Sequence, residues 1–240
     1  MEHLLPGGVG TVGVTAKDNR LFVEAVLYRY RVGIPWRDLP ECFGDFWVIH
    51  TRHMHWGKRS VWQRVFEVLA AEADNEYTQL DSTIVRAHQH SAGAKSDRTE
   101  ECIGRSSGGL TAKIRATCDA LGNLTGFYLS PVQAHDLESA DVLLEALLDQ
   151  IQALLADIAY VAKARLLDGL EQRQVEAVIP PKSNQKQPWE FDRDKYRWRH
   201  LIENLFAKWK QYRGIATRYD KRVYAFLGGI HWIAAFIWLN

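Results

Sequence analysis

Apolar residues in the first quarter of the chain recur every three or four positions, which is the spacing of amphipathic helices. One helix is expected to begin after Asp18 or Asn19 and to end at the turn that starts with Gly33. Two more are expected from about Asp45 and from Ser60 to Ala73. The order of a helix, a Gly/Pro turn and a basic helix is compatible with a DNA-binding helix-turn-helix motif, and also with a structural helical subdomain.

From Tyr77 onward, short apolar strands alternate with helices. Residues 89–109 are small, polar and rich in Gly and Ser, so a flexible loop is expected there. The pattern predicts a helical domain at 1–75 and an α/β domain at 76–240, whose element order matches an RNase H-like mixed sheet flanked by helices. The expected strands are 78–85, 110–118, 124–130, 154–156 and 176–179, and the expected helices are 134–148 and 162–173.

A later helix carries Tyr196, Arg199, Glu203 and Lys210 at spacings of three, four and seven. At about 100° per residue, these side chains share one sector of the helix. A carboxylate between cations and a phenol suits metal-assisted phosphodiester chemistry, in which the anion binds Mg²⁺ and the cations hold phosphate. An amphipathic helix with a solvated salt-bridge face gives the same pattern, because i,i+4 charge pairs are common.

Charge is distributed unevenly along the chain. The net charge is only +1, yet residues 182–222 hold twelve Lys and Arg against five Asp and Glu, interleaved with aromatic residues. A basic stretch with aromatics is typical of nucleic-acid binding, and a solvated face over core aromatics is the alternative. The three cysteines lack a CxxC spacing, which favours a reducing cytosol. The apolar segment 223–239 is expected to be a buried helix, and no signal peptide or membrane partner is expected.

The segment from Tyr196 through Arg199 and Glu203 to Lys210 resembles the Tyr-Arg-Glu-Lys motif of DDE-type insertion-sequence transposases of the IS-five kind. The resemblance runs from about Asn19 to the C-terminus. It implies an RNase H-like catalytic domain and a DNA transposase that acts on the terminal inverted repeats of a mobile element. Other segments similar to the family are Gly33-Ile-Pro-Trp-Arg-Asp-Leu-Pro40, Leu80-Asp-Ser-Thr-Ile-Val-Arg-Ala-His88, Gly108-Gly-Leu-Thr-Ala-Lys113 and Ile215-Ala-Thr-Arg-Tyr-Asp220.

In such a fold, Asp81 lies on the first strand, Asp157 ends the fourth, and Glu203 lies on the helix after the fifth. We expect these carboxylates to meet at one sheet edge, to be catalytic, and to bind two Mg²⁺ or Mn²⁺ ions, because converging carboxylates need a counter-charge. The resemblance implies cleavage that exposes a 3′ hydroxyl, followed by its attack on target DNA.

The resemblance also implies the partners. Double-stranded DNA, at the transposon ends and the target, is the expected ligand, bound by a homodimer in the bacterial cytoplasm at the nucleoid. Arg199 and Lys210 are expected to contact phosphates and Tyr196 a base or sugar. Further DNA-binding residues are expected at Arg52, Lys58, Arg59 and Lys113. A zinc site at His88, His90 and His135 is disfavoured by their spacing.

Two departures from the family pattern favour an impaired copy. The family usually has Asp-Lys-Ala/Gly-Tyr-Asp where this chain has Asp157-Ile158-Ala159-Tyr160-Val161, so a cation and an acid become apolar. The chain also starts late, just before Leu4. A non-catalytic repressor that occupies the inverted repeats is therefore the main alternative. A general nuclease of RNase H type is a third one, disfavoured by the Tyr196–Lys210 motif.

Overall fold

Three helices precede the sheet in the computed structural model. They are α1 (Asn19–Val32), α2 (Phe46–Lys58) and α3 (Val61–Ala70), with short 3-10 turns η1 (Glu2–Leu4), η2 (Trp36–Asp38) and η3 (Glu41–Phe43). The side chains of Asp18 and Asp45 accept the N–H groups of Leu21 and Trp47, each at 2.8 Å, so the N-cap predicted at Asp18 and the helix start predicted near Asp45 are confirmed. The structure describes residues 2–8, 16, 18–93, 100–133, 143–145, 147–162, 164–181 and 188–239, without the side chains of 161, 162 and 164–166.

The strands form one mixed sheet around β1 (Tyr77–Ala87) and β3 (Gly109–Cys118), which pair antiparallel. On the far side of β3 lie β4 (Leu124–Pro131) and the short β2 (Gly104–Ser106). On the far side of β1 lie β5 (Ala153–Ala156), then β6 (Glu176–Val178), and the two-residue β7 (Thr217–Arg218). The order β4-β3-β1-β5-β6 is that of an RNase H-like α/β fold, as the sequence predicted.

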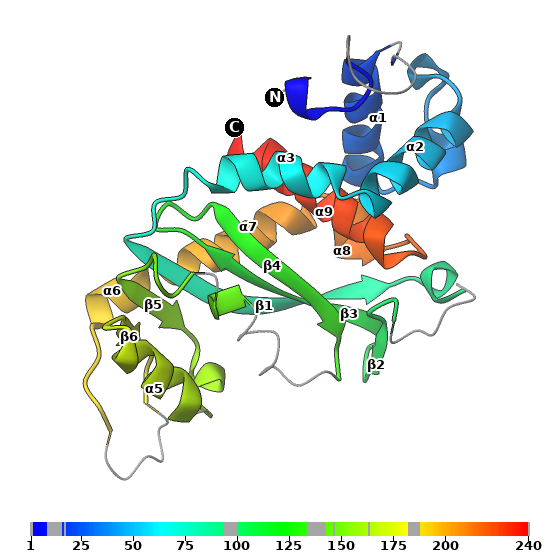
Figure 1. Ribbon diagram of the computed structural model, residues 1–240. Coiled ribbons are helices and arrows are strands. Elements are labelled where there is room, and N and C mark those ends of the chain that lie inside the picture. Colours follow the sequence, from blue (N-terminus) through cyan, green and yellow to red (C-terminus); the bar gives the residue numbers. More distant parts are fainter. Residues whose placement is uncertain are drawn as a thin grey trace.

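Helices cover both faces of this sheet. On one face lie α6 (Arg193–Arg197), α7 (His200–Lys210), α8 (Arg213–Ala216) and α9 (Val223–Trp238), with α9 between the sheet and α3 (Figure 1). The other side carries η5 (Ile158–Ala162) and α5 (Ala164–Gln172), next to a smaller core that contains Leu80 and Leu154. A further 3-10 turn, η4 (Gln89–Ala92), follows β1.

The largest core cluster joins the N-terminal helices to the sheet. It includes Phe22 of α1, Trp62 of α3, Ile114 of β3 and Ile233 of α9, all almost completely buried. In this cluster α9 approaches Trp62 of α3 closely at Gly228, where a Cβ atom would lie 2.8 Å from Cδ1 of Trp62. The predicted domain division near residue 75 is not tested by these contacts and stays a prediction.

The C-terminal apolar segment is a buried helix, as predicted, because α9 buries most of its residues. Within the described ranges, no helix is both long enough and apolar enough to cross a membrane. The predicted helix at 134–148 falls largely outside the described residues, although 143–145 is helical.

Two predictions about local structure were wrong. The helix expected to carry Tyr196 to Lys210 is interrupted, because Trp198 and Arg199 lie in a turn between α6 and α7. Their N–H groups bond to carbonyls three residues back, Arg199 to Tyr196 at 3.1 Å, which tightens the backbone. In addition, β2 lies inside the expected loop at 89–109, because a tight turn lets its residues pair with the start of β3.

Candidate active site

The parallel pairing of β1 with β5 places Asp81 beside Asp157. Leu80 and Ala156 are partners in this register, and each is followed directly by one of the two carboxylates. Neighbouring strands lie about 4.8 Å apart, and equivalent positions face the same side of a sheet. Asp81 and Asp157 therefore lie side by side on one face of the sheet, where the pairing of β1 with β5 ends.

Burial raises the pKa of Asp81 above its usual value, and the charge of Asp157 raises it further. The N–H of Ser82, which donates to Oδ1 of Asp81 at 2.7 Å, and the nearby Arg199 act in the opposite direction. The sheet edge is thus a place where a carboxylate is held partly out of water next to a second one.

Arg199 connects Asp81 to Glu203. Its Nη1 donates to Oδ2 of Asp81 at 2.8 Å, and its Nη2 makes a short bond to Oε1 of Glu203. The side chains of Arg199 and Asp81 are 18% and 20% exposed, whereas that of Glu203 is 54% exposed. One guanidinium thus brings the carboxylate of α7 to the edge that carries the two aspartates.

Gln79 fixes α7 on the sheet, and the sequence reasoning missed it. Its side-chain Oε1 accepts the N–H of Ile202 at 3.1 Å, and the Gln79 side chain is fully buried. Ile202 is the third residue of α7, so its N–H has no partner within the helix. The only signal in the sequence was an amide on the same strand as Asp81, two positions before it.

Tyr196 packs behind Arg199. It packs against the small cluster of Ala153, Leu155 and Val178, and its ring meets that of Phe191 edge-on at 5.6 Å. The guanidinium of Arg199 lies 5.8 Å from its centroid, and burial raises the pKa of the Tyr196 hydroxyl. Tyr196 thus supports the arginine from the ends of β5 and β6.

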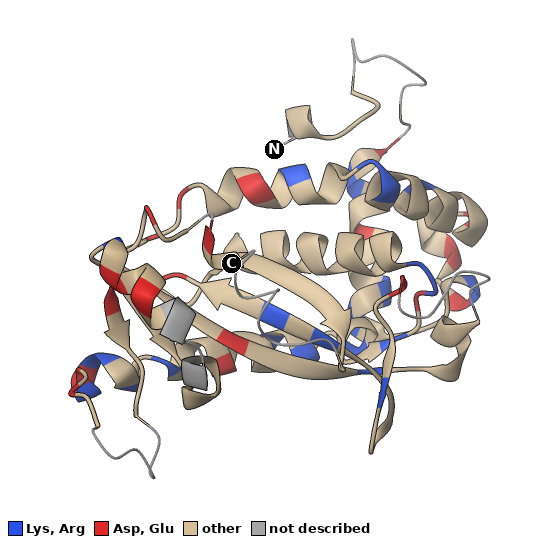
Figure 2. Ribbon diagram, turned by 60° about the horizontal axis from the view of Figure 1, so that its bottom comes forward, with Lys and Arg blue, Asp and Glu red and all other residues tan. Residues whose placement is uncertain are grey.

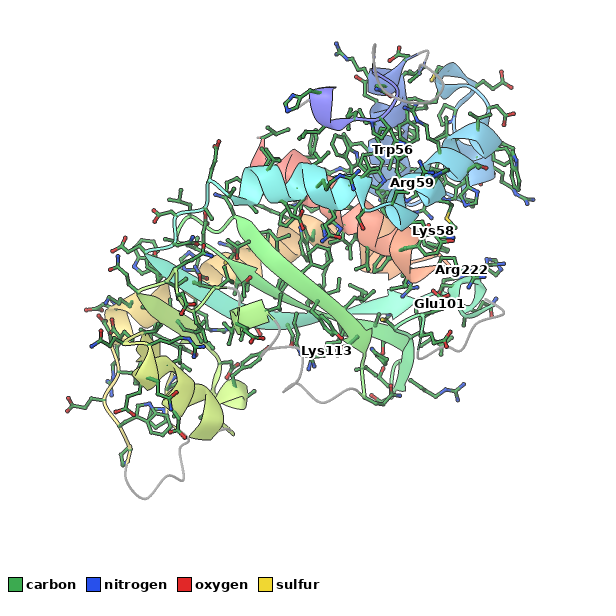
Figure 3. The ribbon with its side chains drawn as sticks, viewed as in Figure 1. Trp56, Lys58, Arg59, Glu101, Lys113 and Arg222 are labelled. Carbon is green, nitrogen blue, oxygen red and sulfur yellow. The ribbon has the colours of Figure 1, made fainter. Side chains whose placement is uncertain are left out.

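The other predicted cations are dispersed over the molecule. Basic residues occur on the helices and also in the central strands (Figure 2). Lys210 is exposed at the end of α7, about 10 Å along the helix axis from Glu203. Lys113 pairs with Ile84 on β1, three residues from Asp81, so it faces the opposite side of the sheet. Figure 3 shows Lys113 on the other side of the strands from Lys58 and Arg59.

The Arg52 side chain packs mainly against aromatic rings of the N-terminal helices. Its guanidinium lies 4.2 Å from the ring centroid of Phe22 and 4.7 Å from that of Trp56, and it bonds to the side chain of Asn19. Burial lowers its pKa. Lys58 ends α2 and Arg59 follows it, and both side chains are exposed (Figure 3). Of these three predicted DNA contacts, Lys58 and Arg59 are the accessible ones.

The described residues contain no group of three or more His, Cys, Asp or Glu arranged to hold a metal ion. In the carboxylate cluster, the Arg199 guanidinium lies between Asp81 and Glu203. His88 and His90 lie beyond the end of β1, with ring centroids 4.5 Å apart, and His135 lies outside the described residues.

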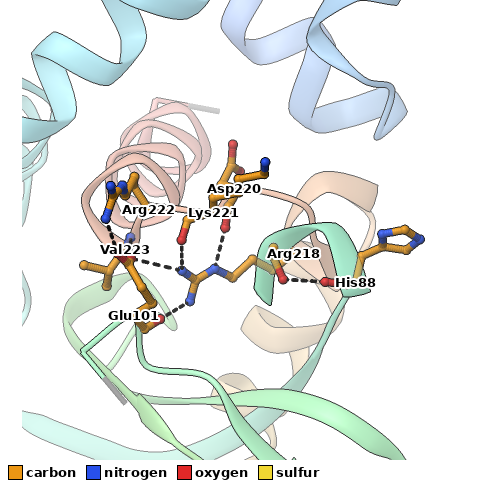
Figure 4. Close-up of polar contacts among 8 residues, drawn as sticks. His88, Glu101, Arg218, Asp220, Lys221, Arg222 and Val223 are labelled. Atoms are coloured by element: carbon orange, nitrogen blue, oxygen red, sulfur yellow. Dashed lines mark hydrogen bonds and ion pairs between the residues drawn. The ribbon is translucent and has the colours of Figure 1, made fainter. Parts of the chain in front are cut away.

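A second polar cluster, absent from the sequence analysis, surrounds Arg218 (Figure 4). Arg218 is fully buried and donates to the backbone carbonyls of Glu101 at 2.7 Å and Asp220 at 2.9 Å. The Glu101 carboxylate accepts the N–H of Val223 at 2.6 Å, at the start of α9, and pairs with Arg222 at 3.0 Å. This cluster holds the segment before β2 against the residues that run from β7 to the start of α9.

The comparisons with known proteins agree with this arrangement. Residues 1–66 match the family described as "Putative transposase of IS4/5 family", and residues 76–237 match the family described as "Transposase DDE domain". An uncharacterized protein, y4sN, of Sinorhizobium fredii is 46% identical over 95 residues, which is 40% of this chain and 76% of that protein.

A second relative carries a descriptive name. The "Putative transposase for insertion sequence element IS6501" of Brucella ovis is 34% identical over 134 residues, which is 55% of this chain and 100% of the relative. The second family model covers well over half of the chain, and the N-terminal model matches the helices before it. The chain therefore belongs to the IS4/5 family of DDE transposases.

Proposed function

We propose that this transposase cleaves DNA at the terminal inverted repeats of its own insertion sequence and joins the exposed ends to target DNA. Asp81, Asp157 and Glu203 are the proposed catalytic carboxylates. The observation that carries this proposal is their convergence: strand register brings the two aspartates together, and Arg199 draws in the glutamate. Phosphoryl-transfer chemistry needs such a cluster of anions to bind metal.

The chemistry of the proposed donors suits a divalent metal, because carboxylate oxygens are the ligands that Mg²⁺ prefers. In the structure, Arg199 occupies one oxygen of Asp81 and one of Glu203, and the described residues form no metal-holding group around them. Mg²⁺ or Mn²⁺, as a pair of ions bound by Asp81, Asp157 and Glu203, would polarise the scissile phosphate and lower the pKa of the attacking oxygen.

The remaining residues position the DNA. Arg199 beside the carboxylates and Lys210 at the far end of α7 offer cations for phosphates of the transposon end, and Tyr196 offers a partly exposed ring for the sugar or base. Lys58 and Arg59 extend the contact to the N-terminal helices. Because transposition joins two ends, we propose that a homodimer bridges them in the bacterial cytoplasm.

Replacing Asp157 tests the assignment of the carboxylates. Asp157→Ala is expected to reduce nicking of a duplex that carries the inverted repeat by about a thousandfold or more with Mg²⁺ or Mn²⁺. Binding of the same duplex in a gel-shift assay is expected to be retained. A matched control is Asp149→Ala, because the Asp149 side chain is 80% exposed and, within the described part of the chain, pairs with Arg173 alone. Nicking by Asp157→Ala at the rate of the control would refute the assignment.

A repressor that binds the inverted repeats without cutting them is the second candidate. The observation that favours it is the apolar Ile158 directly after Asp157, where the family pattern has a lysine. If the unmodified protein binds the repeats but does not nick them with Mg²⁺ or Mn²⁺, and Ile158→Lys restores nicking, this copy is a repressor derived from a transposase.

A further inference from the structure

Arg199 occupies the position of a counter-ion among the proposed catalytic carboxylates. It makes two charge-assisted bonds, one to Asp81 on the sheet and one to Glu203 on α7. The charge of Asp157 acts on the same guanidinium. Such bonds are roughly twice as strong as neutral ones, and the bond to Asp81 is largely shielded from water, since the side chains of Arg199 and Asp81 are only 18% and 20% exposed.

The same bonds compete with metal binding. The Oδ2 atom of Asp81 and the Oε1 atom of Glu203 that accept from Arg199 are oxygens a shared divalent ion would also use. A metal and the guanidinium together would add positive charge to a half-buried site, and positive charges at close range repel. Metal binding should therefore release at least the bond between Arg199 and Asp81.

We propose that Arg199 is an exchangeable counter-ion, a positioning residue that holds Asp81 and Glu203 together in the free protein and transfers to a DNA phosphate when metal binds. This inference rests on the proposed function of the three carboxylates. The released guanidinium has a planar set of donors that matches a phosphate group. Metal and DNA then bind cooperatively, because each ligand removes a competitor of the other.

The geometry allows this exchange. Arg199 precedes the first residue of α7 and has no side-chain capping bond to maintain there. Glu203 is more than half exposed, so the outer side of the ion pair is open to an approaching phosphate. Gln79 holds the start of α7 independently of Arg199, so Glu203 stays near the sheet when the arginine moves.

Equilibrium Mn²⁺ binding, followed by electron paramagnetic resonance, tests the proposal without a catalytic readout. Without DNA, Arg199→Gln is expected to bind Mn²⁺ about tenfold more tightly than the unmodified protein. A short pre-cleaved duplex carrying the inverted-repeat end should raise the Mn²⁺ affinity of the unmodified protein and leave that of Arg199→Gln unchanged. Arg197→Gln is the control and should behave like the unmodified protein. Arg197 lies two residues before Arg199, is 81% exposed and pairs with Asp194.

Two further variants keep the outcomes separable. Arg199→Lys retains the charge but cannot make the two-pronged contact, so its Mn²⁺ affinity should fall between those of the unmodified protein and Arg199→Gln. Asp81→Asn removes a proposed ligand. If Asp81→Asn abolishes Mn²⁺ binding but Arg199→Gln and Arg199→Lys bind like the control, the counter-ion proposal is wrong and the carboxylate assignment stands. If Asp81→Asn binds Mn²⁺ normally, the carboxylate assignment itself is wrong.

Discussion

At the scale of single residues, the start of α7 is attached to β1 by two side chains of opposite character. Gln79 accepts a backbone N–H from Ile202 through a neutral, fully buried bond, and Arg199 reaches Asp81 through a charged one that is nearer to solvent. The neutral bond has no role in charge balance, so its function is to place the helix. Glu203 follows Ile202 directly, and its position therefore depends on Gln79.

Gln79→Leu is expected to lower both stability and activity. It leaves the N–H of Ile202 buried without a partner, which should lower the free energy of unfolding by about 1–3 kcal/mol. Urea titrations measure this loss. DNA nicking should fall by about tenfold or more under conditions where the variant is folded, because a small shift of a catalytic group is costly. Gln63→Leu is the control, since Gln63 is exposed and bonds only to Glu67. Equal stability of the two variants would contradict the placing role of Gln79.

The candidate site could be predicted from the sequence only where a residue is fixed by its place on a strand. Asp81 and Asp157 were predictable because strand order and strand ends decide their positions. Gln79 was not, because its partner is a backbone N–H of a helix far along the chain. The bridging by Arg199 was not predicted: the spacing only allowed for i,i+4 charge pairs along the helix, and nothing local reveals the bond from Arg199 to Asp81.

At the scale of elements, a buried ion pair joins α1 to the segment between β7 and α9. Arg29 and Asp220 are 2.9 Å apart with side chains 2% and 4% exposed, and the hydroxyl of Tyr30 also donates to Asp220 at 3.0 Å. Burial alone would raise the pKa of Asp220, but Arg29, His53 and the Tyr30 hydroxyl hold it below the usual value. Removing one partner would leave an uncompensated buried charge.

Asp220→Asn keeps the size of the side chain and removes its charge. It is expected to lower the unfolding free energy by about 3 kcal/mol or more, because Arg29 stays buried. Glu24→Gln breaks the exposed pair with Arg20 on the same helix and should change stability little. Thermal and urea unfolding of the two variants provide the measurement. A loss as small as that of Glu24→Gln would show that the ion pair does not hold α1 to the C-terminal segment.

Elements with local signals were predicted well. Asp18 and Asp45 cap their helices through bonds within three residues, and the hairpin of β3 and β4 has its turn residues between its strands. The interruption before α7 was missed, because no Gly or Pro marks it, and the contacts of Arg199 and Ile202 with β1 beside it are not visible in the local sequence. The strands β2 and β7 are too short for any alternation to be recognised.

At the scale of the whole molecule, the core that joins α1–α3 to α9 contains histidines that stay neutral. Burial lowers the pKa of His53 and of His231 from the ordinary 6.5 to about 4. The ring of His231 lies between those of Phe66 and Phe127, at 5.6 Å and 4.5 Å. Between pH 6.5 and 4, the unfolded chain binds protons that the folded chain does not, so stability falls as the pH falls through this range.

His231→Leu is expected to reduce this sensitivity to acid. The partly buried His231 is expected to contribute a loss of up to about 3 kcal/mol between pH 6.5 and pH 4, and leucine has no proton to bind. Urea unfolding at several pH values across this range should give a flatter curve for His231→Leu than for the unmodified protein. His55→Asn, at an exposed position of α2, should leave the curve unchanged. Identical slopes for all three proteins would exclude His231 as the source of acid lability.

The register between β1 and β5 has an evolutionary consequence. Only four residue pairs hold these strands together, yet they align two acids that lie far apart along the chain. Deleting one residue within β5 would turn Asp157 to the opposite face of the sheet, whereas inserting a loop before that strand would leave the alignment intact. Transposases of related insertion sequences should thus differ freely in the length of the chain between β1 and β5. Insertions or deletions of a single residue inside either strand should be absent.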